Sequence, residues 1–306
     1  MNIATILLYH GVTSAPSAGI ENFSLKHLPR DTFERQMERV ADRAHPMSLR
    51  EMAGRLQAGD SLPPRSVAVT FDDSFANVAT DALPVLRRHR IPATFFVTSG
   101  FVGTERRFWV DKIEHMINTT TRTELRLETD DLPDRLSLDS AEDRIAAVVA
   151  VKAPMKRMRP TQREAALSQL AVATGVESFD DPAPNYRNLT WDELRRLDAP
   201  PDYEVGGHTV NHEILSYLDD RDLDREIGDC LAALSRGIGR PVDLFSYPEG
   251  QAAHYDQRVI ERLKAHGVTI CPSAIDGVNL PGSDPFHLRR IMVGFMGRAF
   301  PEALFA

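Results

Sequence analysis

Strand-like and helix-like segments alternate along the chain, and this alternation limits the possible fold more than any other feature. Apolar runs of strand length are found at Ile3–Tyr9, Val67–Phe71, Ala93–Thr98, Tyr203–Gly206, Asp243–Tyr247 and Val268–Pro272. Helical patterns lie between them at Thr32–Arg43, Asn77–His89, Asp222–Arg236 and Tyr255–His266, with Asp31 and Ser48 as expected helix caps. Repeated βα units of this length predict an α/β fold with a parallel sheet, open or closed into a barrel.

Residues 104–190 interrupt this alternation. The segment is charged, contains several prolines, and shows helical patterns at Ala141–Val151 and Thr161–Thr174. We therefore expect residues 1–306 to form a single domain in which residues 104–190 are a mostly helical insertion.

Composition excludes several classes of protein. The 306 residues are 42% hydrophobic, which is enough for a sizeable core, and the net charge of −8 argues against a nucleic-acid partner. Cys230 and Cys271 are isolated, as is usual in a reducing compartment. The N-terminal residues 1–10 lack the features of a signal peptide, and no run approaches the ~20 apolar residues of a membrane span. We expect a soluble, cytoplasmic protein without a transmembrane segment; the sequence gives no indication of its oligomeric state.

Two adjacent carboxylates follow the strand expected at Ser66–Phe71. Asp72 and Asp73 should therefore lie at the C-terminal edge of the sheet, where α/β proteins place their sites. As an alternative, one of the two aspartates could cap the following helix, but this would explain only one of the pair. Two like charges this close are costly unless a cation compensates them.

The pentapeptide His208-Thr-Val-Asn-His212 supplies two imidazoles. Alone it is weak, because two solvated or core histidines on one helical face would give the same spacing. Together with the aspartate pair it provides two imidazoles and one carboxylate, a metal ligand set that leaves room for water and substrate. The other carboxylate is then available to take a proton from that water. These residues predict a metal-dependent hydrolase.

Three ordered motifs resemble those of the polysaccharide deacetylases, the NodB-homology group or carbohydrate esterase family 4. They are Thr70-Phe-Asp-Asp73, His208-Thr-Val-Asn-His212 and Phe245-Ser-Tyr-Pro-Glu-Gly250, with further similarity at Leu8-Tyr-His-Gly11, Ile91-Pro-Ala-Thr-Phe-Phe96 and Asp284-Pro-Phe-His-Leu-Arg-Arg-Ile291. The resemblance implies a distorted (β/α)7-type barrel with the helical insertion between the aspartate and histidine motifs. It also implies metal-dependent removal of an N-acyl group from an amino sugar.

The resemblance assigns roles to individual residues. It implies that Asp72 is the catalytic base, that Asp73, His208 and His212 bind the metal, and that a backbone N–H near Pro248 and Glu249 helps to hold the oxyanion. Zinc is the default metal for two histidines and one aspartate, while cobalt, nickel and iron fit the same ligands. The arginine that braces the base in the family's third motif is replaced by Ser246 or its neighbour.

The general acid of the family is not recognisable, because no clean Leu-x-His motif occurs near the C-terminus. His10 is the first candidate, since it follows a strand and should reach the same rim as Asp72. Some poly-N-acetylglucosamine deacetylases resemble a circular permutation in which an N-terminal histidine takes this role. An acid at neutral pH needs a pKa near or above ~6.5. A histidine bonded to a loop carbonyl is the alternative. His287 is the second candidate, with a surface loop position as its alternative.

Trp109 and Asp111 open the insertion and are candidates for sugar binding, although Trp109 could equally anchor the inserted helices. We expect a cytoplasmic N-deacetylase of surface-glycan biosynthesis that acts on a sugar nucleotide, a lipid-linked sugar or an oligosaccharide. A deformylase or another amide or imide hydrolase on the same metal is one alternative. A catalytically inactive glycan-binding homologue is the other.

Overall fold

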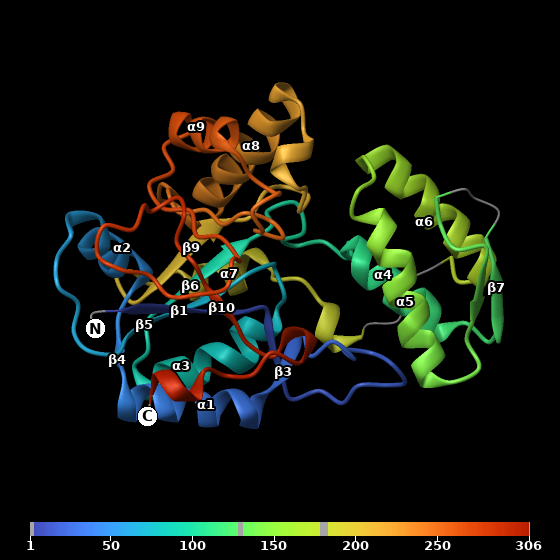
Figure 1. Ribbon diagram of the computed structural model, residues 1–306, viewed down its shortest axis with the longest axis horizontal. Coiled ribbons are helices and arrows are strands. Elements are labelled where there is room, and N and C mark those ends of the chain that lie inside the picture. Colours follow the sequence, from blue (N-terminus) through green and yellow to red (C-terminus); the bar gives the residue numbers. More distant parts are fainter. Residues whose placement is uncertain (1–2, 128–130, 178–182, 306) are drawn as a thin grey trace. The chain divides into compact units, whose positions relative to one another are not determined.

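A computed structural model describes residues 3–127, 131–177 and 183–305, and the chain forms two compact units (Figure 1). The first unit comprises Met1–Ser14, Ser24–Glu105 and Arg187–Ala306, and the second comprises Ala15–Phe23 and Arg106–Tyr186. The longer segment of the second unit, Arg106–Tyr186, therefore begins and ends within a few residues of the insertion expected at 104–190. The contribution of Ala15–Phe23 to it was not expected from the sequence.

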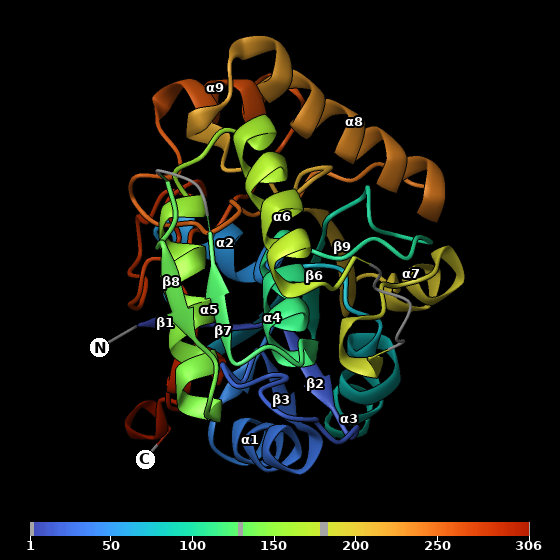
Figure 2. The same ribbon diagram turned by 90° about the vertical axis from the view of Figure 1, so that its right-hand side faces the viewer.

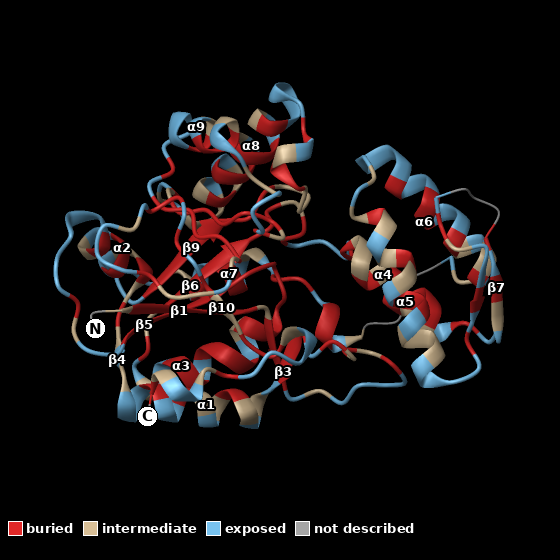
Figure 3. Ribbon diagram, in the orientation of Figure 1, coloured by how far each residue is buried: buried red, intermediate tan, exposed pale blue. Residues whose placement is uncertain are grey.

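A parallel sheet forms the centre of the first unit. Its strands are β1 (Ala4–Tyr9), β4 (His45–Pro46), β5 (Ser66–Phe71), β6 (Ala93–Val97), β9 (Tyr203–Gly207) and β10 (Ile291–Met292). The order is β10-β1-β5-β6-β9, with β4 added beside β5, and every pairing is parallel. All residues of β1, β5, β6 and β9 are buried (Figure 3), as is typical of a parallel sheet covered on both faces.

Irregular segments connect the two edges of this sheet. Isolated parallel bridges join β9 to Phe245 and then Leu244 to Ile270. Cys271, Ser273 and Ile275 are in turn hydrogen-bonded to backbone groups of residues 285–290, which lead into β10. The strands expected at 243–247 and 268–272 are present only as isolated bridges at Leu244, Phe245 and Ile270. The result is a distorted barrel rather than an open sheet.

Helices surround the barrel. They are α1 (Arg30–Arg43), α2 (Leu49–Ala58), α3 (Leu83–His89), α7 (Trp191–Leu197), α8 (Asp220–Ile238) and α9 (Gln257–Ala265), and Val78–Ala82 forms a π-helical turn before α3. Ser48 caps α2 as expected, with its hydroxyl accepting the Glu51 N–H at 3.1 Å. The cap expected at Asp31 is wrong: the chain enters α1 directly from β3 (His27–Pro29), so Pro29 is in the cap position and Asp31 lies in the first turn. There its charge favours the positive end of the helix dipole.

The second unit has its own apolar core. It contains α4 (Trp109–Thr119), α5 (Ala141–Met155), α6 (Pro160–Thr174) and the antiparallel pair β7 (Glu124–Arg126) and β8 (Arg135–Ser137), seen together in Figure 2. Ile113, Val148 and Leu170 are fully buried where the three helices meet. Among the described residues, no helix has both the length and the apolar character needed to cross a membrane.

A glycine in β9 tests the tight packing of the barrel. A Cβ added at Gly206 would lie 2.6 Å from the Phe96 ring and 3.0 Å from the Leu244 Cβ, inside the core. We expect Gly206→Ala to lower the free energy of unfolding by about 1–3 kcal/mol in urea titrations. Gly54→Ala in α2 is the matched control, because nothing lies within 4 Å of that Cβ. It should stabilise the protein by about 0.5–1 kcal/mol; equal effects of the two substitutions would contradict this packing.

Candidate metal centre and catalytic residues

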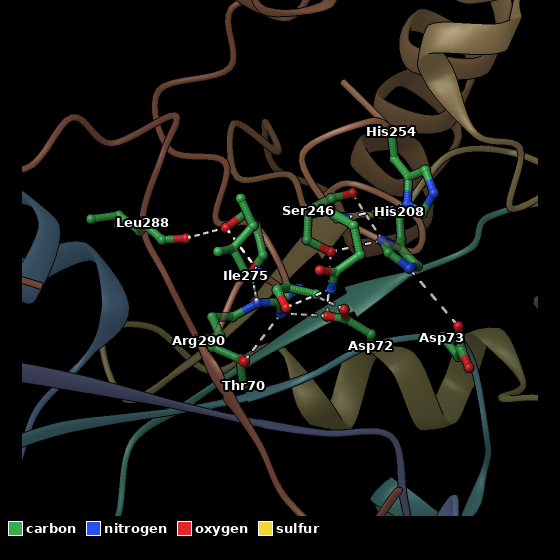
Figure 4. Close-up of polar contacts among 12 residues, drawn as sticks. Thr70, Asp72, Asp73, His208, Ser246, His254, Ile275, Leu288 and Arg290 are labelled. Carbon is green, nitrogen blue, oxygen red and sulfur yellow. Dashed lines mark hydrogen bonds and ion pairs between the residues drawn. The ribbon is translucent and has the colours of Figure 1, made fainter. Parts of the chain in front are cut away.

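The end of β5 presents both aspartates to the same region. The Asp72 N–H donates to the Tyr9 carbonyl at 3.0 Å, so Asp72 still continues the ladder with β1. In a regular strand the next side chain would point to the opposite face. Asp73, however, has φ 75°, in the left-handed region, which turns the backbone at this residue. Both carboxyl groups consequently lie near His208 (Figure 4). Such strain in a non-glycine residue is often found at functional sites.

His208 follows β9 and is held by the segment after it. Its Nδ1 lies 2.9 Å from the Ser246 carbonyl oxygen and 2.7 Å from the Ser246 hydroxyl. A carbonyl oxygen can only accept, so Nδ1 carries the proton and Nε2 presents its lone pair. Nε2 faces Asp73 Oδ1 at 3.9 Å. Fixing the second ring nitrogen in this way is the usual arrangement for a metal-binding histidine.

His212 completes a cluster of three ligand atoms. Its Nε2 lies 3.3 Å from Asp73 Oδ1, and the ligand atoms of Asp73, His208 and His212 are all within 4.8 Å of one another. Ligands about 2.1 Å from a tetrahedral ion are roughly 3.4 Å apart, close to the two measured separations. Asp73 Oδ1 is buried and accepts no well-directed hydrogen bond in the part of the chain that the structure describes. These three residues therefore fit a divalent metal ion in position and chemistry.

Asp73 and His212 shift each other's pKa. Burial alone would lower the pKa of His212, but the Asp73 carboxylate raises it above the ordinary value. Burial would likewise raise the pKa of Asp73, but the His212 imidazole holds it well below the usual range. A positive charge is thus favoured beside Asp73.

Asp72 is braced by an arginine that the sequence did not reveal. Arg290 is 0% exposed, and its two terminal nitrogens lie 2.8 and 2.7 Å from the two oxygens of Asp72 (Figure 4). Its Nε donates to the Ser273 carbonyl at 2.6 Å. Burial raises the pKa of Asp72, but Arg290 and then His208 outweigh it, so the pKa is lowered and the group is ionised at neutral pH.

Ser246 contacts the other side of the Asp72 carboxylate. Its hydroxyl donates to Asp72 Oδ1 at 3.3 Å and leaves the space beside the carboxylate to Arg290. The arginine that holds Asp72, Arg290, therefore comes from the segment before β10. The sequence signal was the Arg289-Arg290 pair, but nothing in it distinguishes the buried arginine from the exposed one.

His10 lies after β1, next to the aspartates. Its Nδ1 is buried and has no hydrogen-bond partner in the described chain, and its ring centroid lies 5.3 Å from that of Phe295. The expected pKa near or above 6.5 is wrong for the metal-free protein: burial lowers the pKa, and the charges of Asp73 and Asp72, which raise it, do not compensate. The alternative for this residue, a hydrogen bond to a loop carbonyl, is also not found at Nδ1 in the described residues.

The other predicted site residues have different surroundings. His287 is 51% exposed, pairs with Asp284 at 3.3 Å and lies against the Tyr255 ring, as a surface residue would. Glu249 has φ 59°, and its charge contributes, after that of Asp73, to raising the pKa of His212. An oxyanion-binding N–H near Pro248 and Glu249 stays a prediction.

Trp109 and Asp111 belong to the second unit. Trp109 packs against that unit's apolar core, and the Arg163 guanidinium lies over its ring at 5.2 Å. Asp111 is buried. These contacts give Trp109 an anchoring role in the second unit, and sugar binding by either residue stays a prediction.

Comparisons with known proteins identify the class to which this fold and site belong. The fold matches the Streptococcus pyogenes deacetylase PplD with TM-score 0.62 at 17% identity, covering 99% of this chain and 96% of that one. It matches IcaB from Ammonifex degensii with TM-score 0.60 at 18% identity, covering 99% and 94%. The predicted distorted (β/α)7-type barrel is thereby confirmed.

The family follows from the sequence comparison. The family model for polysaccharide deacetylase matches residues 59–271, and the chain belongs to this NodB-homology family. A poly-beta-1,6-N-acetyl-D-glucosamine N-deacetylase of Staphylococcus aureus (strain MSSA476) is 32% identical over 124 residues. That match covers 37% of this chain and 41% of the length of the relative.

The Asp72–Arg290 pair makes a stability prediction. Arg290→Ala leaves a buried carboxylate without its cation and should lower the free energy of unfolding at pH 7 by about 3–5 kcal/mol. Arg289→Ala is the control, because this neighbour is exposed and its side chain donates to the Asp276 carbonyl rather than to Asp72, and it should change stability by less than about 0.5 kcal/mol. Urea titrations of both variants measure the difference.

The same pair predicts a pH dependence. Because Asp72 has a lowered pKa in the folded wild type, its contribution to stability is present above the ordinary value of 3.8 and is lost as the pH falls through the lower folded value. In Arg290→Ala the pKa of Asp72 should rise. Its carboxylate should therefore be protonated at a higher pH than in wild type, which removes the unpaired buried charge. The stability deficit should then shrink as the pH is lowered from 7 towards 4, and a deficit independent of pH would contradict the charge pairing.

Proposed function

We propose that this protein is a metal-dependent hydrolase that removes N-acetyl groups from an amino sugar of a surface glycan. The observation that carries the proposal is the buried cluster of Asp73, His208 and His212 beside a second, separately braced carboxylate. Membership of the polysaccharide deacetylase family supports it. A binding module would have no need for an ionised aspartate next to the metal ligands, so this pairing favours an enzyme over an inactive homologue.

In this proposal the reaction is divided among the chain's own groups. A divalent metal, by preference zinc, would lower the pKa of water and polarise the acyl oxygen. Asp72 accepts the proton of the attacking water, and Arg290 keeps that carboxylate ionised and oriented towards the cluster. His10 gives a proton to the leaving nitrogen. Burial lowers the pKa of His10. The proton that it donates as the C–N bond breaks is replaced from solvent, and Asp72 releases to solvent the proton that it took from water.

The first substrate to test follows from the relatives. The Staphylococcus aureus relative is named for poly-beta-1,6-N-acetyl-D-glucosamine, so short β-1,6-linked N-acetylglucosamine oligomers are the starting point. Sugar nucleotides and lipid-linked sugars are further substrate forms, and formamido analogues of each separate a deacetylase from a deformylase. The cytoplasmic location expected from the sequence stays a prediction.

Asp72→Asn and Asp73→Ala separate the base from the ligand. Asp72→Asn should keep the fold and one bound zinc ion while losing at least ~10²-fold in deacetylation rate, because an amide cannot accept the proton. Asp73→Ala should lose both the zinc and the activity. Zinc content is measured by atomic absorption and turnover by release of acetate. Undiminished turnover by Asp72→Asn would show that another residue is the general base.

His10 makes a prediction that depends on the leaving group. His10→Ala should slow hydrolysis of an acetamido sugar far more than hydrolysis of an activated aryl acetate, because a phenolate leaves without protonation. His287→Ala, which changes an exposed histidine, should leave both rates unchanged. Equal losses on the two substrates would show that His10 does not act as the general acid.

A further inference from the structure

The loop that carries both histidine ligands has a strained backbone. Thr209 has φ 64° and His212 has φ 60°, so two non-glycine residues of this pentapeptide occupy the left-handed region. A β-branched residue such as Thr209 is a rare occupant of that region. Conformations of this kind persist only where surrounding contacts impose them. Something must therefore hold residues 208–212 in place.

One side of the loop is held by backbone groups that follow β6. The N–H groups of Ser99 and Gly100 donate to the carbonyls of Thr209 and Val210 at 3.1 and 3.0 Å. These bonds satisfy loop acceptors only. The His208 N–H donates to the Val97 carbonyl of β6 at 3.0 Å, but the N–H groups of Val210 and Asn211 need an acceptor elsewhere.

That acceptor is a single buried carboxylate on α8. Glu226 is 8% exposed, and its Oε2 accepts the backbone N–H of Val210 at 2.9 Å and that of Asn211 at 2.8 Å. Its Oε1 accepts the Asn211 side-chain amide at 2.6 Å. Successive backbone N–H groups that converge on one anion form a directed contact. A carboxylate is costly to bury, and these donors offset the cost only while the loop keeps this shape.

We propose that Glu226 is a positioning residue for the metal centre: it fixes the loop so that His208 and His212 both face Asp73. This inference rests on the proposed metal site and goes beyond it, because Glu226 lies outside the set of ligands. With the loop fixed in advance, the two imidazoles need not be ordered when the metal binds. Metal affinity should therefore depend on Glu226.

Glu226→Ala tests the inference in two ways, one of which needs no metal. In the metal-free protein, hydrogen exchange of the Val210 and Asn211 amides should accelerate at least ~10-fold, because their acceptor is gone. Zinc affinity, measured by competition with a chromophoric chelator, should weaken ~10–100-fold. Asp219→Ala is the matched control on the same helix, since it removes the N-cap of α8 without touching the loop. It should lower the melting temperature but leave both readouts unchanged.

A reversed pair keeps the test decisive if Glu226→Ala fails to fold. Asn211→Asp alone places a second carboxylate against Glu226 and should weaken zinc binding. Adding Glu226→Gln restores one donor and one acceptor between the two side chains, while the glutamine oxygen still accepts both backbone N–H groups. The double variant should recover zinc affinity to within ~3-fold of wild type. No recovery would overturn the proposal, as would wild-type zinc affinity and exchange in Glu226→Ala.

Failure of the metal site itself would look different. If wild-type protein and Asp73→Ala bind zinc equally, the proposed centre is wrong whatever Glu226 does. If wild-type protein binds zinc, Asp73→Ala does not, and Glu226→Ala binds it as tightly as wild type, the centre stands and the positioning role falls.

Discussion

The buried ion pair between Asp72 and Arg290 is the interaction on which the site depends. Two adjacent carboxylates at the end of one buried strand repel each other and lose their hydration, so each needs its own positive partner. Arg290 takes both oxygens of Asp72, whereas Asp73 is left to the imidazoles of His208 and His212. This division gives the two aspartates different chemistry. The group held by a fixed guanidinium stays ionised and stays in place, and the group beside the histidines remains open to a metal ion.

The closure of the barrel brings this brace to the site. Residues 285–290 bond to the segment 271–275 and continue into β10 beside β1, which puts Arg290 opposite the end of β5. Holding Asp72 so firmly also weakens it as a base, since a lowered pKa means a lower affinity for a proton. The proposed reaction therefore needs a cation that makes water more acidic.

The local motifs could be predicted from the sequence, and the long-range partners could not. Asp73, His208 and His212 come together as expected, because the strands before Asp73 and His208 end at one rim and His212 is only four residues from His208. Arg290 is 218 residues from Asp72 in sequence, and only the folded barrel selects it over the neighbouring Arg289. The lowered pKa of His10 also escaped prediction, because the degree of burial is a property of the packed site. The joining of residues 15–23 to the helical unit has no signal in the periodicity of the chain.

Anomalous diffraction at the zinc edge, from crystals of wild-type protein grown with one equivalent of zinc, tests the central claim most directly. The account predicts one strong peak about 2.0–2.2 Å from a carboxylate oxygen of Asp73 and from the Nε2 atoms of His208 and His212. It also predicts that Asp72 keeps both bonds to Arg290 and lies beside the ion without ligating it. A peak elsewhere, or an Asp72 that leaves Arg290 to bind the zinc, would contradict the division of roles between the two aspartates.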